Sequence, residues 1–106
     1  MARVLVSVPP TAKRGELIEI RTLAEHPMET GIRRTQLGEL VARDIITRFE
    51  CAYNGREVFR VDLHPAVAAN PLVSFTTLAT DSGELVFRWI GDKGYSVTQT
   101  AKITVE

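Results

Sequence analysis

Apolar and polar residues alternate along most of this chain, and a period of two is typical of β-strands with one buried face. In residues 3–8 the valines at positions 4, 6 and 8 share one face, and Pro9-Pro10 then ends the pattern because proline has no N–H for a sheet. The same alternation predicts seven strands, at residues 3–8, 16–23, 45–53, 57–63, 72–80, 84–90 and 96–105.

Turn sequences separate most of these segments. Asn54-Gly55 tolerates the positive φ angles of a type I′ turn, so it predicts a tight hairpin between the third and fourth strands. Three further turn signals stand at residues 13–15, 81–83 and 92–94. Segments 24–44 and 64–71 are long enough to cross between sheets. Seven short strands with almost no helix pattern predict an all-β, immunoglobulin-like antiparallel β-sandwich.

The predicted strands do not separate cleanly into an apolar and a polar face. Phe49, Cys51 and Tyr53 would face the core, together with Trp89 as its anchor. Apolar side chains also lie opposite the predicted core residues, at Ile46, Leu72, Leu78, Val86 and Ile90. Some of these must be exposed unless a loop or another chain covers them, so the pattern predicts association through an open sheet face or edge.

The chain has 106 residues, of which 44% are hydrophobic, and this length fits one domain over residues 1–106 with a core that needs no disulfide or metal. Thirteen basic residues balance thirteen acidic ones without a run of like charge, so we expect no nucleic-acid and no membrane partner. We also expect no export signal or membrane anchor. The single cysteine, Cys51, can form no internal disulfide and by itself favours a reducing compartment.

The densest chemistry lies in residues 24–31, where one strand pattern stops. Proline and glycine keep this loop from continuing as a strand or helix. Its polar and sulfur-bearing side chains are Glu25, His26, Met28, Glu29 and Thr30. The sequence predicts either a functional loop or a structural corner. Residues 30–44 show no clear period, and we expect mostly loop there, with a short helical turn or an irregular edge.

His26, Met28, His64 and Cys51 are residue types that bind copper or iron, but no pair has the spacing of a common ligand motif. The histidines are better interpreted as hydrogen-bonding partners of loop backbone, and Cys51 as a small buried hydrophobe. Asp62 and His64 could form an acid–base pair, yet no nucleophile stands with them. We therefore expect no catalytic residue, no metal ligand and no cofactor.

Several short motifs resemble the SoxZ family, the carrier subunits of sulfur oxidation. They are the hexapeptide at residues 26–31, the Asn54-Gly55 hairpin, the segment Pro65-Ala66-Val67 followed by Asn70-Pro71 and Phe75, and Trp89 with Asp92-Lys93-Gly94. The resemblance spans nearly the whole chain. A fibronectin-like domain would not ordinarily share the hexapeptide or the Asn-Pro spacing.

The resemblance implies an immunoglobulin-like sandwich that pairs with SoxY, as a heterodimer or heterotetramer. In such complexes the glycine-rich C-terminal tail of SoxY carries the cysteine to which thiosulfate-derived sulfur is attached, and other Sox enzymes dock transiently. Residues 103–106 hold no glycine-flanked cysteine, so this chain would be the non-catalytic half of the carrier. The family also implies a periplasmic location, reached by export with a SoxY that bears a twin-arginine signal. That implication replaces the compartment that Cys51 alone favours.

Partner-binding residues would then come from the loop and from the second crossover. We expect them to form a recognition corner for SoxY or for the Sox enzymes, made of Glu25, His26, Pro27, Met28, Glu29, Thr30, Asn70 and Pro71. Two alternatives remain open. One is a generic immunoglobulin-like interaction module without a sulfur role, and the other is a small metal-dependent redox domain.

Overall fold

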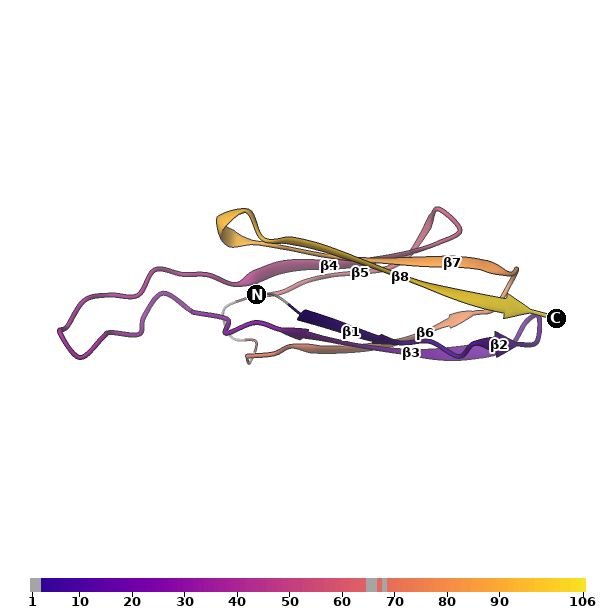
Figure 1. Cartoon of the computed structure of the whole chain (residues 1–106), viewed down its shortest axis with the longest axis horizontal. Helices are drawn as coiled ribbons and strands as arrows, with labels where there is room; N and C mark the ends of the chain where they lie inside the picture. The colour runs from indigo at the N-terminus through magenta and orange to yellow at the C-terminus, as the bar shows by residue number, and fades with distance from the viewer. Residues whose placement is uncertain (1–2, 65–66, 68) are drawn as a thin grey trace.

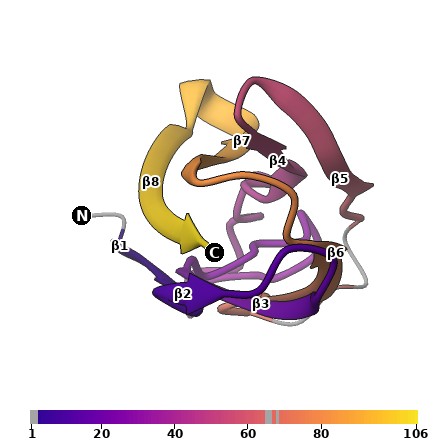
Figure 2. The same cartoon turned by 90° about the vertical axis from the view of Figure 1, so that its right-hand side faces the viewer.

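The computed structural model describes residues 3–64, 67 and 69–106 and shows two layers of β-sheet (Figure 1, Figure 2). The three-stranded sheet has the order β1-β3-β6, with β1 at Arg3–Ser7, β3 at Leu17–Glu25 and β6 at Leu72–Leu78. The five-stranded sheet has the order β2-β8-β7-β4-β5, with β2 at Thr11–Ala12, β4 at Ile46–Tyr53, β5 at Arg56–Asp62, β7 at Gly83–Gly91 and β8 at Ser96–Val105. The predicted immunoglobulin-like sandwich is confirmed.

All seven predicted strands are present, with ends that shift by at most two residues, and one strand, β2, is missing from the prediction. This strand pairs in parallel with β8, through Thr11 with Thr104 and Ala12 with Val105. Pro9-Pro10 separates it from β1, so the chain changes sheets at the two prolines. A two-residue strand is too short to show a period, and the alternation therefore cannot reveal it.

Both predicted crossovers connect strands of different sheets. The first joins β3 to β4, and the second joins β5 to β6. Residues 65–66 and 68 of the second crossover, and with them the Pro65-Ala66 motif, lie outside the described residues. The only helix in the described part of the chain is the 3-10 helix η1 at Asp92–Gly94, and no helix there is long and apolar enough to cross a membrane.

The predicted hairpin between β4 and β5 is confirmed. Asn54 and Gly55 have φ angles of 49° and 83°, as a type I′ turn requires. The Asn54 side chain adds a second function, because its Oδ1 accepts a hydrogen bond of 2.9 Å from the N–H of Glu84 at the start of β7. The turn residue thus also fixes the neighbouring strand.

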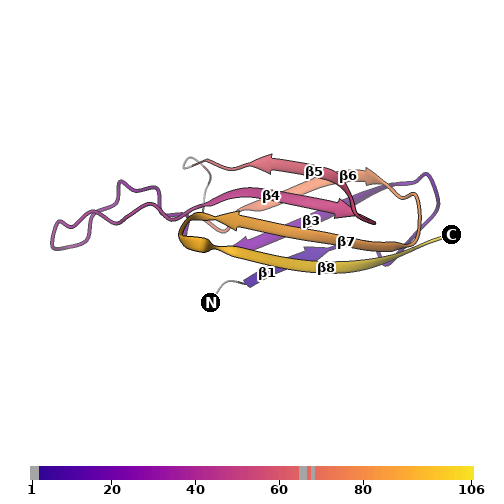
Figure 3. The same cartoon turned by 90° about the horizontal axis from the view of Figure 1, so that it is seen from above.

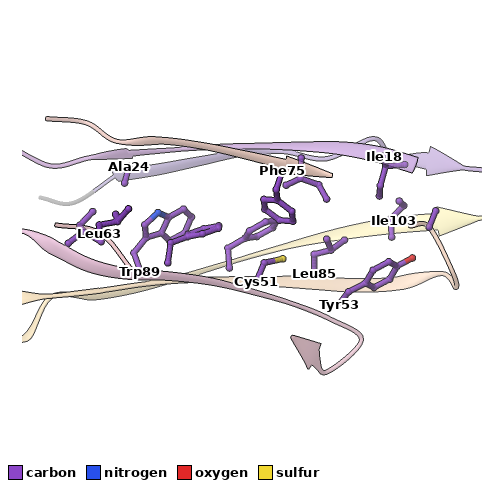
Figure 4. Packing of buried hydrophobic residues seen from close by; sticks show 14 of the residues in the cluster. Ile18, Ala24, Cys51, Tyr53, Leu63, Phe75, Leu85, Trp89 and Ile103 are labelled. Atoms are coloured by element: carbon purple, nitrogen blue, oxygen red, sulfur yellow. The ribbon is translucent and has the colours of Figure 1, made fainter. Parts of the chain in front are cut away.

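Aromatic side chains from both sheets fill the space between the layers. Figure 4 shows Phe75 of β6 and Trp89 of β7 pointing into this space from opposite sides. Phe59 of β5 stacks on Phe75 with ring centroids 4.4 Å apart, and Phe49 of β4 lies 5.1 Å from Trp89. Trp89 is 1% exposed, so its predicted role as the core anchor is confirmed.

The prediction of apolar residues outside the core is confirmed for one sheet and wrong for one residue of the other. Leu72 and Leu78 on β6 are 68% and 51% exposed, as the alternation requires. Ile46, however, is fully buried, and so is its neighbour Ile45. The pairing of β4 with β7 shifts register just after Ile46, and this irregularity lets two successive side chains face inward. Val86 and Ile90 are half-buried.

Two tyrosines with buried hydroxyls differ in their partners. The hydroxyl of Tyr53 donates to the carbonyl of Asp81 at 2.5 Å and accepts from the N–H of Thr80 at 3.3 Å, so it ties β4 to the β6–β7 connection. Among the described residues the hydroxyl of Tyr95 finds no partner. The pair therefore allows a matched test of what the Tyr53 hydrogen bonds contribute.

Replacing Tyr53→Phe should lower the free energy of unfolding by about 1–3 kcal/mol, because the N–H of Thr80 and the carbonyl of Asp81 lose their partner. The matched control Tyr95→Phe should cause no loss, since that hydroxyl has no hydrogen bond to lose among the described residues. Urea denaturation of both variants measures the difference. Equal losses in the two variants would contradict this assignment.

Candidate functional site

The structure divides the predicted loop of residues 24–31 into three parts. Residues 24–25 still belong to β3, residues 26–28 form a short irregular connection, and residue 29 begins a long arm. The side chain of Ala24 is fully buried, and its N–H donates to the carbonyl of Pro71 at 3.2 Å. The loop therefore starts two residues later than the sequence predicts.

His26 stabilises the connection at residues 26–28. Its side chain is almost fully buried, and Nδ1 accepts a hydrogen bond of 3.0 Å from the N–H of Met28. The ring packs edge-on against Tyr95 at a centroid distance of 4.9 Å. Its Nε2 lies 3.8 Å from a carboxylate oxygen of Asp44, which is too far for a hydrogen bond. The prediction that this histidine bonds loop backbone is confirmed.

Asn70 joins the second crossover to the same connection. Its Oδ1 accepts from the N–H of His26 at 2.9 Å, and its own N–H donates to the carbonyl of His26 at 2.8 Å. Asn70 has a φ angle of 52°, a conformation that asparagine tolerates better than most residues. The structure thus brings together the two segments that the sequence assigns to one recognition corner. We call residues 24–28 with Asn70 and Pro71 the corner.

Met28 anchors the corner in the core. It is 4% exposed and has a φ angle of 53°, an uncommon conformation for a side chain of this size. Its sulfur accepts a hydrogen bond of 3.3 Å from the N–H of Ile46 at the start of β4. The thioether therefore links the connection after β3 to the first residue of β4, and this contact is structural.

Burial separates the predicted partner-binding residues into two groups. Pro71 is buried, as are His26 and Met28, so none of the three can touch a partner without rearrangement. Glu29 and Thr30 are half-buried. The exposed members are Glu25, Pro27 and Asn70. The surface that the corner offers is accordingly smaller than the sequence predicts.

Residues 29–44, which we call the arm, project beyond the end of both sheets (Figure 1, Figure 3). The arm is a loosely paired ribbon, with antiparallel bridges between Glu29 and Asp44 and between Arg34 and Leu40. It lengthens the molecule to extents of 59 × 20 × 19 Å. The prediction of mostly loop is confirmed, and of the two alternatives within it the short helical turn is wrong, because the two halves of this segment pair with each other.

Three large apolar side chains of the arm face solvent. Ile32, Leu37 and Leu40 are 81%, 87% and 56% exposed. The alternation of the sequence does not reveal them, although apolar residues without any period have no predicted core position and could have marked the segment. Exposed apolar groups on a projecting ribbon are typical of a contact surface.

Ionic contacts hold the arm at its base. The guanidinium of Arg43 makes two hydrogen bonds of 2.9 Å to the carboxylate of Asp92, which also accepts from the N–H of Ile45 at 3.1 Å. Farther along the arm, the guanidinium of Arg33 donates hydrogen bonds to both carboxylate oxygens of Glu29. These contacts connect the arm to η1 and give it a defined direction.

Cys51 lies inside the sandwich, as Figure 4 shows, and is 1% exposed. Burial raises the pKa of its thiol to about 12, so the nucleophilic thiolate does not form near neutral pH. The interpretation of Cys51 as a buried hydrophobe is confirmed.

The chemistry considered for metal or acid–base sites is not assembled in the described residues. No group of three His, Cys, Asp or Glu side chains in that part of the chain could hold a metal ion. Asp62 accepts a hydrogen bond of 3.1 Å from Arg48, across the hairpin. The side chains that the structure does bring together form the hydrogen-bonded corner and the exposed arm.

Fold and site together define a β-sandwich protein with a projecting contact arm. The family model described as "Sulphur oxidation protein SoxZ" matches residues 6–102, and the chain belongs to the SoxZ family. No curated protein sequence gives a significant match.

Solved structures share the fold. The superoxide reductase (neelaredoxin) from Ignicoccus hospitalis has a TM-score of 0.76 at 21% identity, and the alignment covers 97% of this chain and 80% of that one. The sulfur carrier protein SoxY from Chlorobium limicola f thiosulfatophilum has a TM-score of 0.67 at 15% identity, with 97% and 78% covered. At such low identity these likenesses concern the fold alone.

Asp92 makes the stability of the arm base depend on pH. The hydrogen bonds from Arg43 and from the N–H of Ile45 hold the pKa of Asp92 below its ordinary value of 3.8. A carboxylate with a lowered pKa stabilises the folded state above that value, and the contribution is lost as pH falls through the folded pKa. Asp92→Asn should therefore be less stable than the wild type near neutral pH, with a deficit that shrinks below pH 3.8.

Thermal unfolding of the wild type and of Asp92→Asn, from neutral pH to below pH 3.8, measures the loss of stability. Asp62→Asn is a suitable control, since its salt bridge with Arg48 joins two exposed side chains and contributes little. A deficit of Asp92→Asn that stayed constant down to low pH would contradict the role of its charge.

Proposed function

We propose that this chain is the non-catalytic subunit of a SoxYZ-like sulfur carrier, where it binds and supports a SoxY-like subunit whose cysteine carries the sulfur intermediate. Membership of the SoxZ family supports a role in sulfur oxidation. The partner would form a heterodimer or heterotetramer with this chain in the periplasm, after export with a SoxY-like subunit that bears a twin-arginine signal.

The observation that carries the proposal is the state of the only cysteine. A sulfur carrier needs a thiolate that enzymes can reach, since the thiolate is the nucleophile. Cys51 is 1% exposed and its thiol has a pKa of about 12, so it satisfies neither requirement. The thiol that carries sulfur must then belong to another chain, and this chain supplies structure and recognition.

The arm is the surface best suited to the SoxY-like subunit. Ile32, Leu37 and Leu40 would lose contact with water on binding, while Arg33 and Arg34 flank them as a charged rim. Two of the exposed residues of the corner, Glu25 and Asn70, lie beside the base of the arm in the fold. We assign these to weaker, exchangeable docking of the other Sox enzymes, because a carrier must release each enzyme in turn.

Substituting both Ile32→Asp and Leu37→Asp should weaken the complex with a SoxY-like subunit by at least about tenfold, because each charge would have to be buried unpaired. Calorimetric titration of the separately purified subunits measures the affinity. Leu78→Asp is the control, since this leucine is also exposed, at 51%, but lies on β6, away from the arm. It should leave the affinity unchanged.

Titrations with the SoxY-like subunit and with the Sox enzymes separate the roles of arm and corner. Glu25→Ala should leave SoxY-like binding intact and weaken only the docking of Sox enzymes. If the arm variant bound its partner normally, the arm would be excluded as the SoxY-like interface. If the wild-type chain stayed without a partner on co-expression, the generic interaction module would be favoured.

Cys51→Ala should leave the carrier functional, because the proposal places the sulfur on the partner. Mass spectrometry of the complex after exposure to thiosulfate and the Sox enzymes should show the adduct on the SoxY-like subunit alone, in both the wild type and the variant. The variant should lose on the order of 1 kcal/mol of stability, because a buried sulfur is removed. An adduct on this chain that disappeared with Cys51 would overturn the proposal.

A further inference from the structure

The outer face of the three-stranded sheet carries two rows of leucines. Leu5, Leu23 and Leu72 stand directly opposite one another across β1, β3 and β6. Leu17 and Leu78 form the second row, six residues along each strand from the first. Leu5 is 46% exposed, Leu17 67%, Leu72 68% and Leu78 51%. In Figure 1 this sheet forms the lower layer, and no other described segment covers its outer side.

Between the two rows the face is polar. On β3 the outward residues read Leu17, Glu19, Arg21 and Leu23 in order, and Glu25 follows beyond the second row at the end of the strand. Their partners on β6 read, from the other end, Leu72, Ser74, Thr76 and Leu78. Between the two rows, from Leu17 to Leu23 on β3 and from Leu72 to Leu78 on β6, the outward face therefore begins and ends with leucine. On β3 the two central side chains have opposite charges, and on β6 both carry a hydroxyl.

Such an order is complementary to itself when it is reversed. A two-fold axis that lies in the interface perpendicular to the strands, at the level of Ile20 and its β6 partner Phe75, turns each strand onto its own copy in the opposite direction. Leu17 then faces Leu23 of the second copy, and Glu19 faces Arg21 of the second copy. On β6, the first leucine likewise meets the last.

The charges distinguish this axis from its alternative. A two-fold axis that runs along β3, parallel to the strands, would place Glu19 on Glu19 and Arg21 on Arg21, and like charges in direct opposition are unfavourable. In the free chain the two side chains are exposed and bind each other, with 2.9 Å between an Arg21 nitrogen and a Glu19 oxygen. Both are therefore available at the surface for the antiparallel arrangement.

We propose that this face binds a second copy of the chain, with the two three-stranded sheets packed face to face and their β3 strands antiparallel. The face is about 20 Å long from Leu17 to Leu23 and about 10 Å between its outer strands, at the usual spacings of a sheet. That is smaller than a standard interface of about 1,600 Å². The dimer is accordingly weak and dependent on concentration.

This arrangement does not depend on the proposed function. The arm leaves the sandwich along its long axis (Figure 1), whereas the leucine rows lie on the outer face of the three-stranded sheet. Reversal of the strands would direct the two arms of a dimer to opposite ends. Each arm would stay free for another protein, so dimerisation and partner binding can be tested separately.

Sedimentation velocity of the full chain over a concentration series tests the proposal. The wild type should dimerise, and Glu19→Arg or Arg21→Glu should each weaken dimerisation at least about tenfold, because each places like charges in opposition. Both side chains are exposed, so the fold should persist, as circular dichroism can verify. Glu84→Arg, at an exposed position of β7 in the other sheet, is the control and should leave the dimer unchanged.

Charge reversal gives the decisive outcomes. An equimolar mixture of the two single variants should dimerise again, since each acidic face then meets a basic one, and the double variant Glu19→Arg/Arg21→Glu should dimerise alone. A wild type that stays monomeric, or single variants that dimerise normally, would overturn the proposal. So would a SoxY-like subunit that dissolves the dimer and loses affinity for Arg21→Glu, because the face would then belong to that partner.

Discussion

The contact between Phe59 and Phe75 is the interaction on which the arrangement of this protein depends. Phe59 lies on β5 and Phe75 on β6, so their stacked rings join an edge strand of one sheet to an edge strand of the other. Side chains alternate across a strand, and an inward Phe75 therefore fixes which β6 residues point outward. Because Phe75 pairs with Ile20, the same contact sets the outward face of β3. The exposed leucine rows are thus a consequence of core packing.

Polar contacts at the corner solve a different problem. The chain must change sheets between β3 and β4, and His26 and Met28 of the connection are buried. The backbone groups of this connection therefore need hydrogen-bond partners. His26 and Asn70 supply these partners through their side chains and their own backbone. The imidazole of His26 and the thioether of Met28 suggest reactivity in the sequence, yet each accepts a hydrogen bond from a backbone N–H. Their burial also explains why the exposed chemistry lies farther out, on the arm.

How much the sequence could predict depends on the range of the interactions involved. Alternation within a strand is local, and it locates seven strands and the Asn54-Gly55 hairpin. The irregular pairing that buries Ile46 arises between β4 and β7, which are distant in sequence, and no local pattern contains it. The pairing of the arm with itself is similarly hidden, because residues 30–44 have no period. Motif resemblance indicated the family, whereas the burial of His26 required the tertiary structure.

The two apolar surfaces differ in a way that suits different partners. The arm presents isolated apolar groups on a thin ribbon, which can insert into a concave surface of a larger protein. The leucine rows lie on a flat sheet face with opposite charges at its centre, and a flat face is best matched by another flat face. The chain has equal numbers of acidic and basic residues, so net repulsion between copies does not oppose such a match. Under the two proposals, an antiparallel pair presents two arms at its two ends, one for each of two partner subunits.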